Sequence, residues 1–270
     1  MRYPAVAGRF YPNDKRTLND EIRKCFTHPI GPGLPEGCSE ERKIVSVIAP
    51  HAGYMASGMN AAHAYKRIAE DGLPDVYIVI GPDHYGIPYD VAMCGEPYVT
   101  PLGVCGVHKE MINILKGAIP DDPYSHKFEH SVEVHVPFIQ YIDPDPFIVP
   151  IIMGDQSREC VEYLVKAITE ACEGLDALVI ASSDMSHYVP KEQAYSEGKE
   201  VLEKVCACDV PGMYDVIEKR RITACGYGPM AVAMSLGRPA GELLRYSDSQ
   251  DSLGPHDGGA VGYASVAFFR

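Results

Sequence analysis

The 270-residue sequence contains no tryptophan and is poor in basic residues, with 24 Lys and Arg against 37 Asp and Glu. Its formal net charge at pH 7 is −13. Non-specific binding to nucleic acid or to an anionic membrane surface requires a basic patch. We therefore expect neither nucleic acid nor a membrane as a partner. The longest uncharged run, residues 44–65, is interrupted by Pro50 and His51 and is not typical of a membrane span.

The nine cysteines show no spacing typical of a disulfide framework or a zinc ribbon, and no CxxC pair occurs. Scattered cysteines of odd number indicate reduced thiols, as in a cytoplasmic protein. Residues 1–8 contain no apolar stretch typical of a signal peptide. We therefore expect a cytoplasmic location.

Several catalytic and cofactor motifs are also missing. The sequence has no GxGxxG, no P-loop and no GxSxG, which disfavours nucleotide binding and serine-hydrolase chemistry. With 46% hydrophobic residues and no linker-like shift in composition, the chain is long enough to bury a sizeable core in one domain.

Short apolar runs rich in β-branched residues alternate with amphipathic segments. This alternation predicts an α/β fold: a single domain over residues 1–270, with a mostly parallel central sheet covered by helices on both faces. The predicted strands are 43–49, 76–80, 147–152, 177–181, 241–246 and 262–269. The predicted helices are 17–26, 57–69, 157–172, 190–206, 210–219 and 230–236.

Three predicted strands are each followed within a few residues by a histidine: His51, His84 and His187. A single loop histidine is usually an ordinary surface residue. In an open α/β sheet, however, ligands bind at the carboxyl ends of the strands, where these three residues meet. Neutral imidazole is the commonest metal ligand and a frequent general base. The pattern therefore predicts one shared site.

Two further segments are candidates for that site. Residues 129–137 hold two His and two Glu, but His130 and His135 are five apart and so do not form a zinc-binding HExxH helix. A capped helix with acidic residues near its positive end explains the segment equally well. Cys225 precedes a Gly-x-Gly-Pro turn and a predicted helix, and a helix N-terminus lowers the pKa of a thiol. The alternative is an inert thiol, as most of the other cysteines should be.

Seven segments, in order along the whole chain, resemble the Memo family, in the form called AmmeMemoRadiSam system protein B. They are RYPAVAGRFYP (2–12), APHAGY (49–54), GPDH (81–84), EHSVEVHVP (129–137), SSDMSH (182–187), TACG (223–226) and VGYAS (261–265). Prokaryotic genes of this family are often linked to genes for a radical-SAM protein and an AMMECR-type protein. The resemblance therefore implies these two proteins as candidate partners.

The Memo fold is similar to that of class III extradiol dioxygenases, which hold iron with two histidines and a glutamate. The resemblance implies His51 and His84 as metal ligands, with Cys225 where the dioxygenases have the glutamate. It also implies His187 as an acid/base residue, with Asp184 beside it. Two imidazoles and a thiolate form a softer set, so the divalent transition metal would be iron, copper or zinc.

Two functions remain open from the sequence. One is a metal-dependent redox enzyme or oxygenase-like protein of unknown substrate. The other is a non-catalytic binding module for a phosphopeptide or a protein partner on a dioxygenase-like scaffold. In either case we expect a small-molecule or peptide ligand. We expect its pocket to be lined by Tyr54, Glu129, His130, Glu133, His135 and Ser183.

Overall fold

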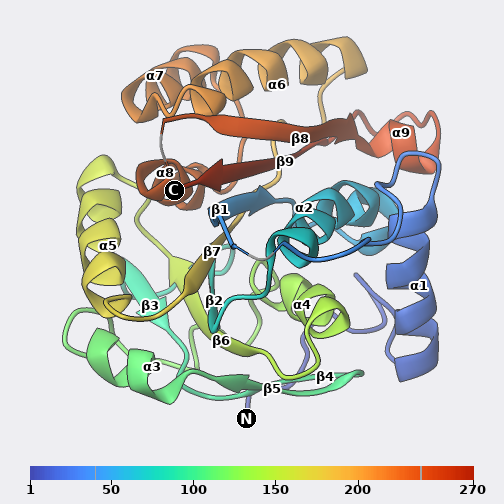
Figure 1. The fold of residues 1–270 in the computed structure, drawn as a ribbon. Helices are drawn as coiled ribbons and strands as arrows, with labels where there is room; N and C mark the ends of the chain where they lie inside the picture. The colour runs from blue at the N-terminus through green and yellow to red at the C-terminus, as the bar shows by residue number, and fades with distance from the viewer. Residues whose placement is uncertain (40, 238) are drawn as a thin grey trace.

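The computed structural model describes residues 1–39, 41–237 and 239–270, and its centre is a nine-stranded mixed sheet (Figure 1). The strand order is β4-β5-β6-β2-β7-β1-β9-β8, and β3 pairs with β6. The strands are β1 (Ile44–Ala49), β2 (Val76–Pro82), β3 (Val91–Met93), β4 (Tyr98–Thr100), β5 (Gly103–Val107), β6 (Phe147–Met153), β7 (Ala177–Ser182), β8 (Gly241–Asp248) and β9 (Gly262–Phe269). The α-helices are α1 (Lys15–Thr27), α2 (Met59–Asp71), α3 (Lys109–Leu115), α4 (Val136–Ile142), α5 (Arg158–Ala171), α6 (Lys191–Cys206), α7 (Val210–Arg220), α8 (Tyr227–Leu236) and α9 (Ser249–Leu253). A π-helical turn, Tyr54–Gly58, precedes α2, and a 3-10 turn, Glu133–His135, precedes α4.

The middle of the sheet is parallel. Strands β5, β6, β2, β7 and β1 run side by side in the same direction. Every residue of β2 is buried, as expected for a strand covered on both faces, because such a strand has no solvent side on which to place polar residues. The predicted α/β fold with a mostly parallel central sheet is therefore confirmed.

The flanks of the sheet are antiparallel. β9 runs against β1, β8 against β9, β4 against β5 and β3 against β6. The sequence prediction missed β3, β4 and β5, which have only three to five residues each. Strands this short carry too few alternating positions for periodicity to reveal them.

Helices pack on both faces of the sheet (Figure 1). On one face, the hydroxyl of Ser265 in β9 donates to the carbonyl of Asn60 in α2. On the other, the hydroxyl of Ser46 in β1 donates to the carbonyl of Ala233 in α8. The predicted covering of both faces is thus confirmed.

The nine cysteines are not joined by disulfides. Among the described residues, no helix combines the length and the apolar character that crossing a bilayer would require.

Candidate metal centre

The site is built at the carboxyl edge of three adjacent parallel strands. β7 lies between β2 and β1, so the ends of these strands are neighbours. The residue two positions past each strand end enters the site: His84 after β2, Asp184 after β7 and His51 after β1. This is the edge where open α/β sheets bind ligands, and it explains why residues from distant segments meet here.

Cys225 reaches the same edge from the turn that precedes α8. Its backbone N–H donates to the Asp184 carbonyl at 3.2 Å, and the Asp184 N–H donates to Cys225 Sγ at 3.2 Å. The side chain of Gln156 fixes the turn by donating to the Cys225 carbonyl. The next residue must be glycine, because a Cβ on Gly226 would lie 2.2 Å from the carbonyl oxygen of Ser182.

Ligand atoms of His51, His84 and Cys225 lie within 4.8 Å of one another and could hold a metal ion. His51 Nε2 lies 3.2 Å from Cys225 Sγ. Two imidazoles and one sulfur make a donor set that suits a transition metal. The structure therefore supports a possible His/Cys metal-binding group made of the three residues expected from the sequence.

Glu129 orients His84. Its carboxylate accepts hydrogen bonds from the His84 N–H at 2.7 Å and from His84 Nδ1 at 3.0 Å, and it also accepts from the backbone N–H groups of His130 and Ser131. Burial favours a high pKa for Glu129, but the hydrogen bond and charge of His84 outweigh it and lower the pKa to about 2. The ionised carboxylate holds the proton of His84 on Nδ1, so Nε2 is the nitrogen left for a metal.

The contact with Glu129 also shifts the pKa of His84. Burial alone would lower the pKa of His84, yet the hydrogen bond and the charge of Glu129 raise it above its usual value. The His84 side chain remains 29% exposed, which makes it the ligand of the group that solvent reaches most readily.

A second group with metal-ligand spacing, His84, Glu129 and His130, lies beside the first. Its close packing is explained by hydrogen bonds and ion pairs, since Glu129 Oε1 is 3.0 Å from His84 Nδ1 and 3.3 Å from His130 Nδ1. The ring of His130 faces both site histidines, with centroids 4.6 Å from His84 and 5.4 Å from His51. The ring of Phe10 also packs against His130, with the centroids 4.8 Å apart. The ring of His130 therefore packs beside both candidate histidine ligands.

His51 is almost fully buried, and its ring is held by a hydrogen bond to Ser182. Its Nδ1 lies 2.6 Å from the hydroxyl of Ser182, and the same hydroxyl is 2.9 Å from Nε2 of His135. Burial, and then the charges of His130 and His84, lower the pKa of His51 well below its usual value. His51 is therefore neutral, which is the form that binds metal.

The thiol of Cys225 does not have the low pKa that a helix N-terminus predicts. Cys225 does lie just before α8, but burial and the neighbouring Asp184 raise its pKa. Loss of solvation outweighs the helix dipole here, because a buried thiolate has too little water around it. In the metal-free chain the group is a thiol, and a bound metal would have to displace its proton.

His187 has one free ring nitrogen. Its Nδ1 lies 2.8 Å from the Thr223 carbonyl, which can only accept, so the proton is on Nδ1 and the lone pair is on Nε2. Asp184 contacts one of the candidate metal ligands: one carboxylate oxygen accepts from the His51 N–H at 2.9 Å, and the other is 4.0 Å from His51 Nε2. Burial raises the pKa of Asp184.

Three residues expected to line the pocket belong instead to its framework. The hydroxyl of Tyr54 donates to the Val134 carbonyl at 2.7 Å. Ser183 accepts a hydrogen bond from the Gly226 N–H at 3.0 Å and so supports the Cys225 turn. Glu133 is fully buried and bound to the N-terminal segment: its donors are Arg2, the N–H groups of Ala5 and Val6, and the Tyr11 hydroxyl.

Sequence reasoning missed two residues of the site. Phe10 reaches His130 because Glu133 binds the N-terminal segment, a contact that no local pattern indicates. Ser182 could have been found, because it is the last residue of the strand between the two that deliver His51 and His84.

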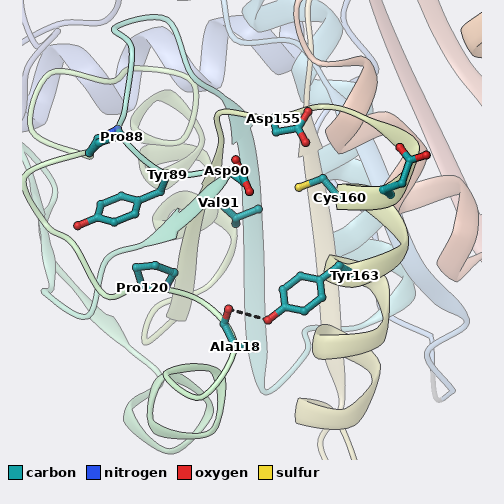
Figure 2. Close-up of a pocket in the computed structure, with 10 residues that line it drawn as sticks. Pro88, Tyr89, Asp90, Val91, Ala118, Pro120, Asp155, Cys160 and Tyr163 are labelled. Carbon is teal, nitrogen blue, oxygen red and sulfur yellow. Dashed lines mark hydrogen bonds between the residues drawn. The ribbon is translucent and has the colours of Figure 1, made fainter.

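A separate cavity of about 590 Å³ lies near the end of β6 and is shown in Figure 2. Tyr89, Asp90 and Asp155 line it, together with Tyr163, whose hydroxyl donates to the Ala118 carbonyl at 2.9 Å. None of the three candidate metal ligands is among its lining residues. The cavity is therefore distinct from the metal centre.

Comparison with known proteins identifies the family. Residues 2–267 match a family model described as Memo-like protein. The chain belongs to the Memo family. A MEMO1 family protein from Methanopyrus kandleri is 40% identical over 281 aligned residues, covering 100% of this chain and 99% of the relative. A MEMO1 family protein from Methanothermobacter thermautotrophicus is 40% identical over 277 residues, covering 99% and 100%.

Beyond the Memo relatives, a solved structure shares the fold. It is an uncharacterized protein, JW3007, from Escherichia coli K12, with a TM-score of 0.54 and 12% sequence identity. The match covers 83% of this chain and 99% of that one. At this identity the likeness concerns the fold alone.

Proposed function

We propose that this Memo family chain holds one transition metal ion with His51 Nε2, His84 Nε2 and Cys225 Sγ, and acts as a metal-dependent redox enzyme or oxygenase-like protein. The observation that carries the proposal is the meeting of these donors, within 4.8 Å, from three separate loops. The hydrogen-bond partners of His51 and His84 at Nδ1 leave Nε2 of each ring as the nitrogen for a metal.

The donor set fits a metal of intermediate softness. Imidazole suits zinc, copper and iron, while thiolate favours copper and zinc over a hard cation. Three protein ligands also leave coordination positions open, as in catalytic sites. When bound, the metal would supply a Lewis acid or a redox centre next to His187 and Asp184.

The surrounding side chains have separate tasks in this proposal. His187, with its lone pair on Nε2, accepts or returns a proton from a ligand at the site. Asp184 holds the His51 backbone through one oxygen and turns the other toward the metal position. The neutral ring of His130, whose pKa burial lowers to about 4, forms an uncharged wall against which the ligand packs.

Exposed aromatic rings next to the site histidines favour a second candidate, a binding module without turnover. Tyr85 follows His84 and is 58% exposed, Phe128 precedes Glu129 and is 52% exposed, and Tyr188 follows His187 and is 77% exposed. Aromatic side chains are enriched where proteins meet partners. A phosphopeptide, or a radical-SAM or AMMECR-type protein, would be the partner in that case.

Metal analysis tests the proposal. The chain is purified without added metal, reconstituted separately with Fe(II), copper and Zn(II), dialysed and analysed beside the His51→Ala/His84→Ala variant. We expect about one ion per wild-type chain for at least one metal and almost none for the variant. Equal, near-zero content in both proteins would contradict the metal site. His187→Gln keeps all three candidate ligands and should keep the wild-type metal content. Titration with a phosphotyrosine peptide tests the second candidate, which saturable binding would support and the absence of binding would contradict.

A further inference from the structure

Four buried polar side chains, the last of them His51, form a continuous hydrogen-bonded chain. The Tyr65 hydroxyl is 2.8 Å from His135 Nδ1, His135 Nε2 is 2.9 Å from Ser182 Oγ, and Ser182 Oγ is 2.6 Å from His51 Nδ1. Ser182 Oγ is also 2.6 Å from the Ser131 carbonyl. All four side chains are at most 2% exposed, so water does not replace any of these contacts.

The proton positions in this chain follow from the number of donors. A hydroxyl has one proton, and two oxygens 2.6 Å apart repel each other unless a proton lies between them. The Ser131 carbonyl cannot supply that proton, so Ser182 donates to it. Ser182 then has only lone pairs for its two imidazole neighbours, and both His51 Nδ1 and His135 Nε2 must carry protons. Tyr65 completes the pattern by donating to the unprotonated Nδ1 of His135.

We propose that Ser182, supported by His135 and Tyr65, is a positioning residue that fixes the His51 ring with its proton on Nδ1 and its lone pair on Nε2. That lone pair is directed toward Cys225 Sγ, 3.2 Å away, and toward the space shared with His84. The advantage for metal binding rests on the proposed function. The tautomer itself does not, because the chain is complete in the metal-free protein.

The network orients His51 and does not conduct protons. A proton wire needs an exit to solvent, and this chain ends at Tyr65, which is fully buried in α2. Ser182, which accepts the hydrogen bond from His51, is also held rigidly. It is the last residue of β7 and is paired with Ala49 of β1, two residues before His51. The end of the neighbouring strand β7 thus holds the His51 ring and limits its rotation, so the direction of Nε2 is fixed.

Nitrogen NMR on the wild-type protein tests this directly. Long-range ¹⁵N–¹H correlations distinguish protonated from unprotonated ring nitrogens, and His51→Gln and His135→Gln variants assign the signals. In the metal-free protein we expect opposite tautomers: a proton on Nδ1 of His51 and on Nε2 of His135. A His51 ring protonated on Nε2, or one that exchanges between both forms, would overturn the proposal. The tautomers themselves are read from the wild-type chain, so this result does not depend on whether a Ser182 variant folds.

Variants then test the link to the metal. Ser182→Ala should abolish the single tautomer of His51 and weaken Zn(II) binding by about 10- to 100-fold, the range for residues that orient metal ligands. Ser182→Thr keeps the hydroxyl and should restore the tautomer. Ser46→Ala is the matched control, since Ser46 is a buried strand serine that donates to a carbonyl, and it should change neither property. An unchanged tautomer and Zn(II) affinity in Ser182→Ala would overturn the proposal.

The predicted tautomers in a wild-type chain that binds no metal would support the assignment and contradict the proposed function.

Discussion

His51 Nε2 and Cys225 Sγ lie 3.2 Å apart, although 174 positions separate them in the sequence. In the metal-free chain this is a thiol beside a neutral imidazole nitrogen, because burial raises the pKa of the thiol and lowers that of the ring. A metal that binds here replaces the thiol proton. Several measurable consequences follow from this exchange.

Replacing the sulfur should change both metal affinity and metal preference. We expect Cys225→Ser to bind Zn(II) and copper more than about 100-fold more weakly, a larger loss than for a residue that only orients a ligand. Competition titration with a chromophoric chelator measures the change. Cys94→Ser is a suitable control, since Cys94 is a buried thiol outside the ligand group. Equal losses in the two variants would show that the effect is structural.

Metal binding should release a proton from Cys225. Because the thiol is protonated at neutral pH, the apparent Zn(II) affinity is expected to rise about tenfold per pH unit between pH 7 and 8. The rise should be steeper below the raised pKa of His84, where a second proton must leave. Calorimetry in two buffers of different ionisation enthalpy counts the protons. An affinity independent of pH would mean that the thiolate is already formed.

Glu129 should contribute to stability above its unfolded pKa and lose that contribution in acid. Its folded pKa of about 2 lies below the ordinary value of 4.5, so the stabilisation is present above about pH 4.5 and disappears as the pH falls toward 2. The shift corresponds to at most about 3 kcal/mol in the free energy of unfolding. Glu129→Gln should therefore show a flatter loss of stability between pH 4.5 and 2 in urea unfolding. The exposed Glu170→Gln should follow the wild type.

The buried ion pair between Glu133 and Arg2 should anchor the N-terminal segment. Glu133→Gln leaves the Arg2 guanidinium buried without its counter-charge, and we expect the free energy of unfolding to fall by about 3–5 kcal/mol. Thermal and denaturant unfolding measure this. Glu242→Gln removes a partly exposed partner of Arg67 and should cost less than about 0.5 kcal/mol. A similar small loss for both variants would contradict the anchoring role of Glu133.

Part of the site could be predicted from the sequence. His51 and His84 were found because buried parallel strands are readable from their apolar runs and deliver the residues after them to one edge. Cys225 stood out by its position before a helix. The predicted direction of the Cys225 pKa shift was wrong, because the segments that bury this thiol are distant in the sequence.

The rest depended on contacts between distant segments. Glu133 was grouped with Glu129 because the two are close in sequence, yet its donors come from residues 2–11, and it supports Phe10 instead of the metal ligands. The short strands β3 to β5 carry too little periodicity to be recognised, although β5 pairs with the buried β6.

A crystal structure of the metal-loaded protein, with anomalous data at the absorption edge of the bound metal, tests the central claim most directly. The account predicts one ion bonded to Nε2 of His51 and Nε2 of His84 at about 2.0–2.1 Å and to Sγ of Cys225 at about 2.3 Å if the metal is zinc. An ion held by His84, Glu129 and His130 without the sulfur, or a loaded crystal with no anomalous peak at Cys225, would contradict it.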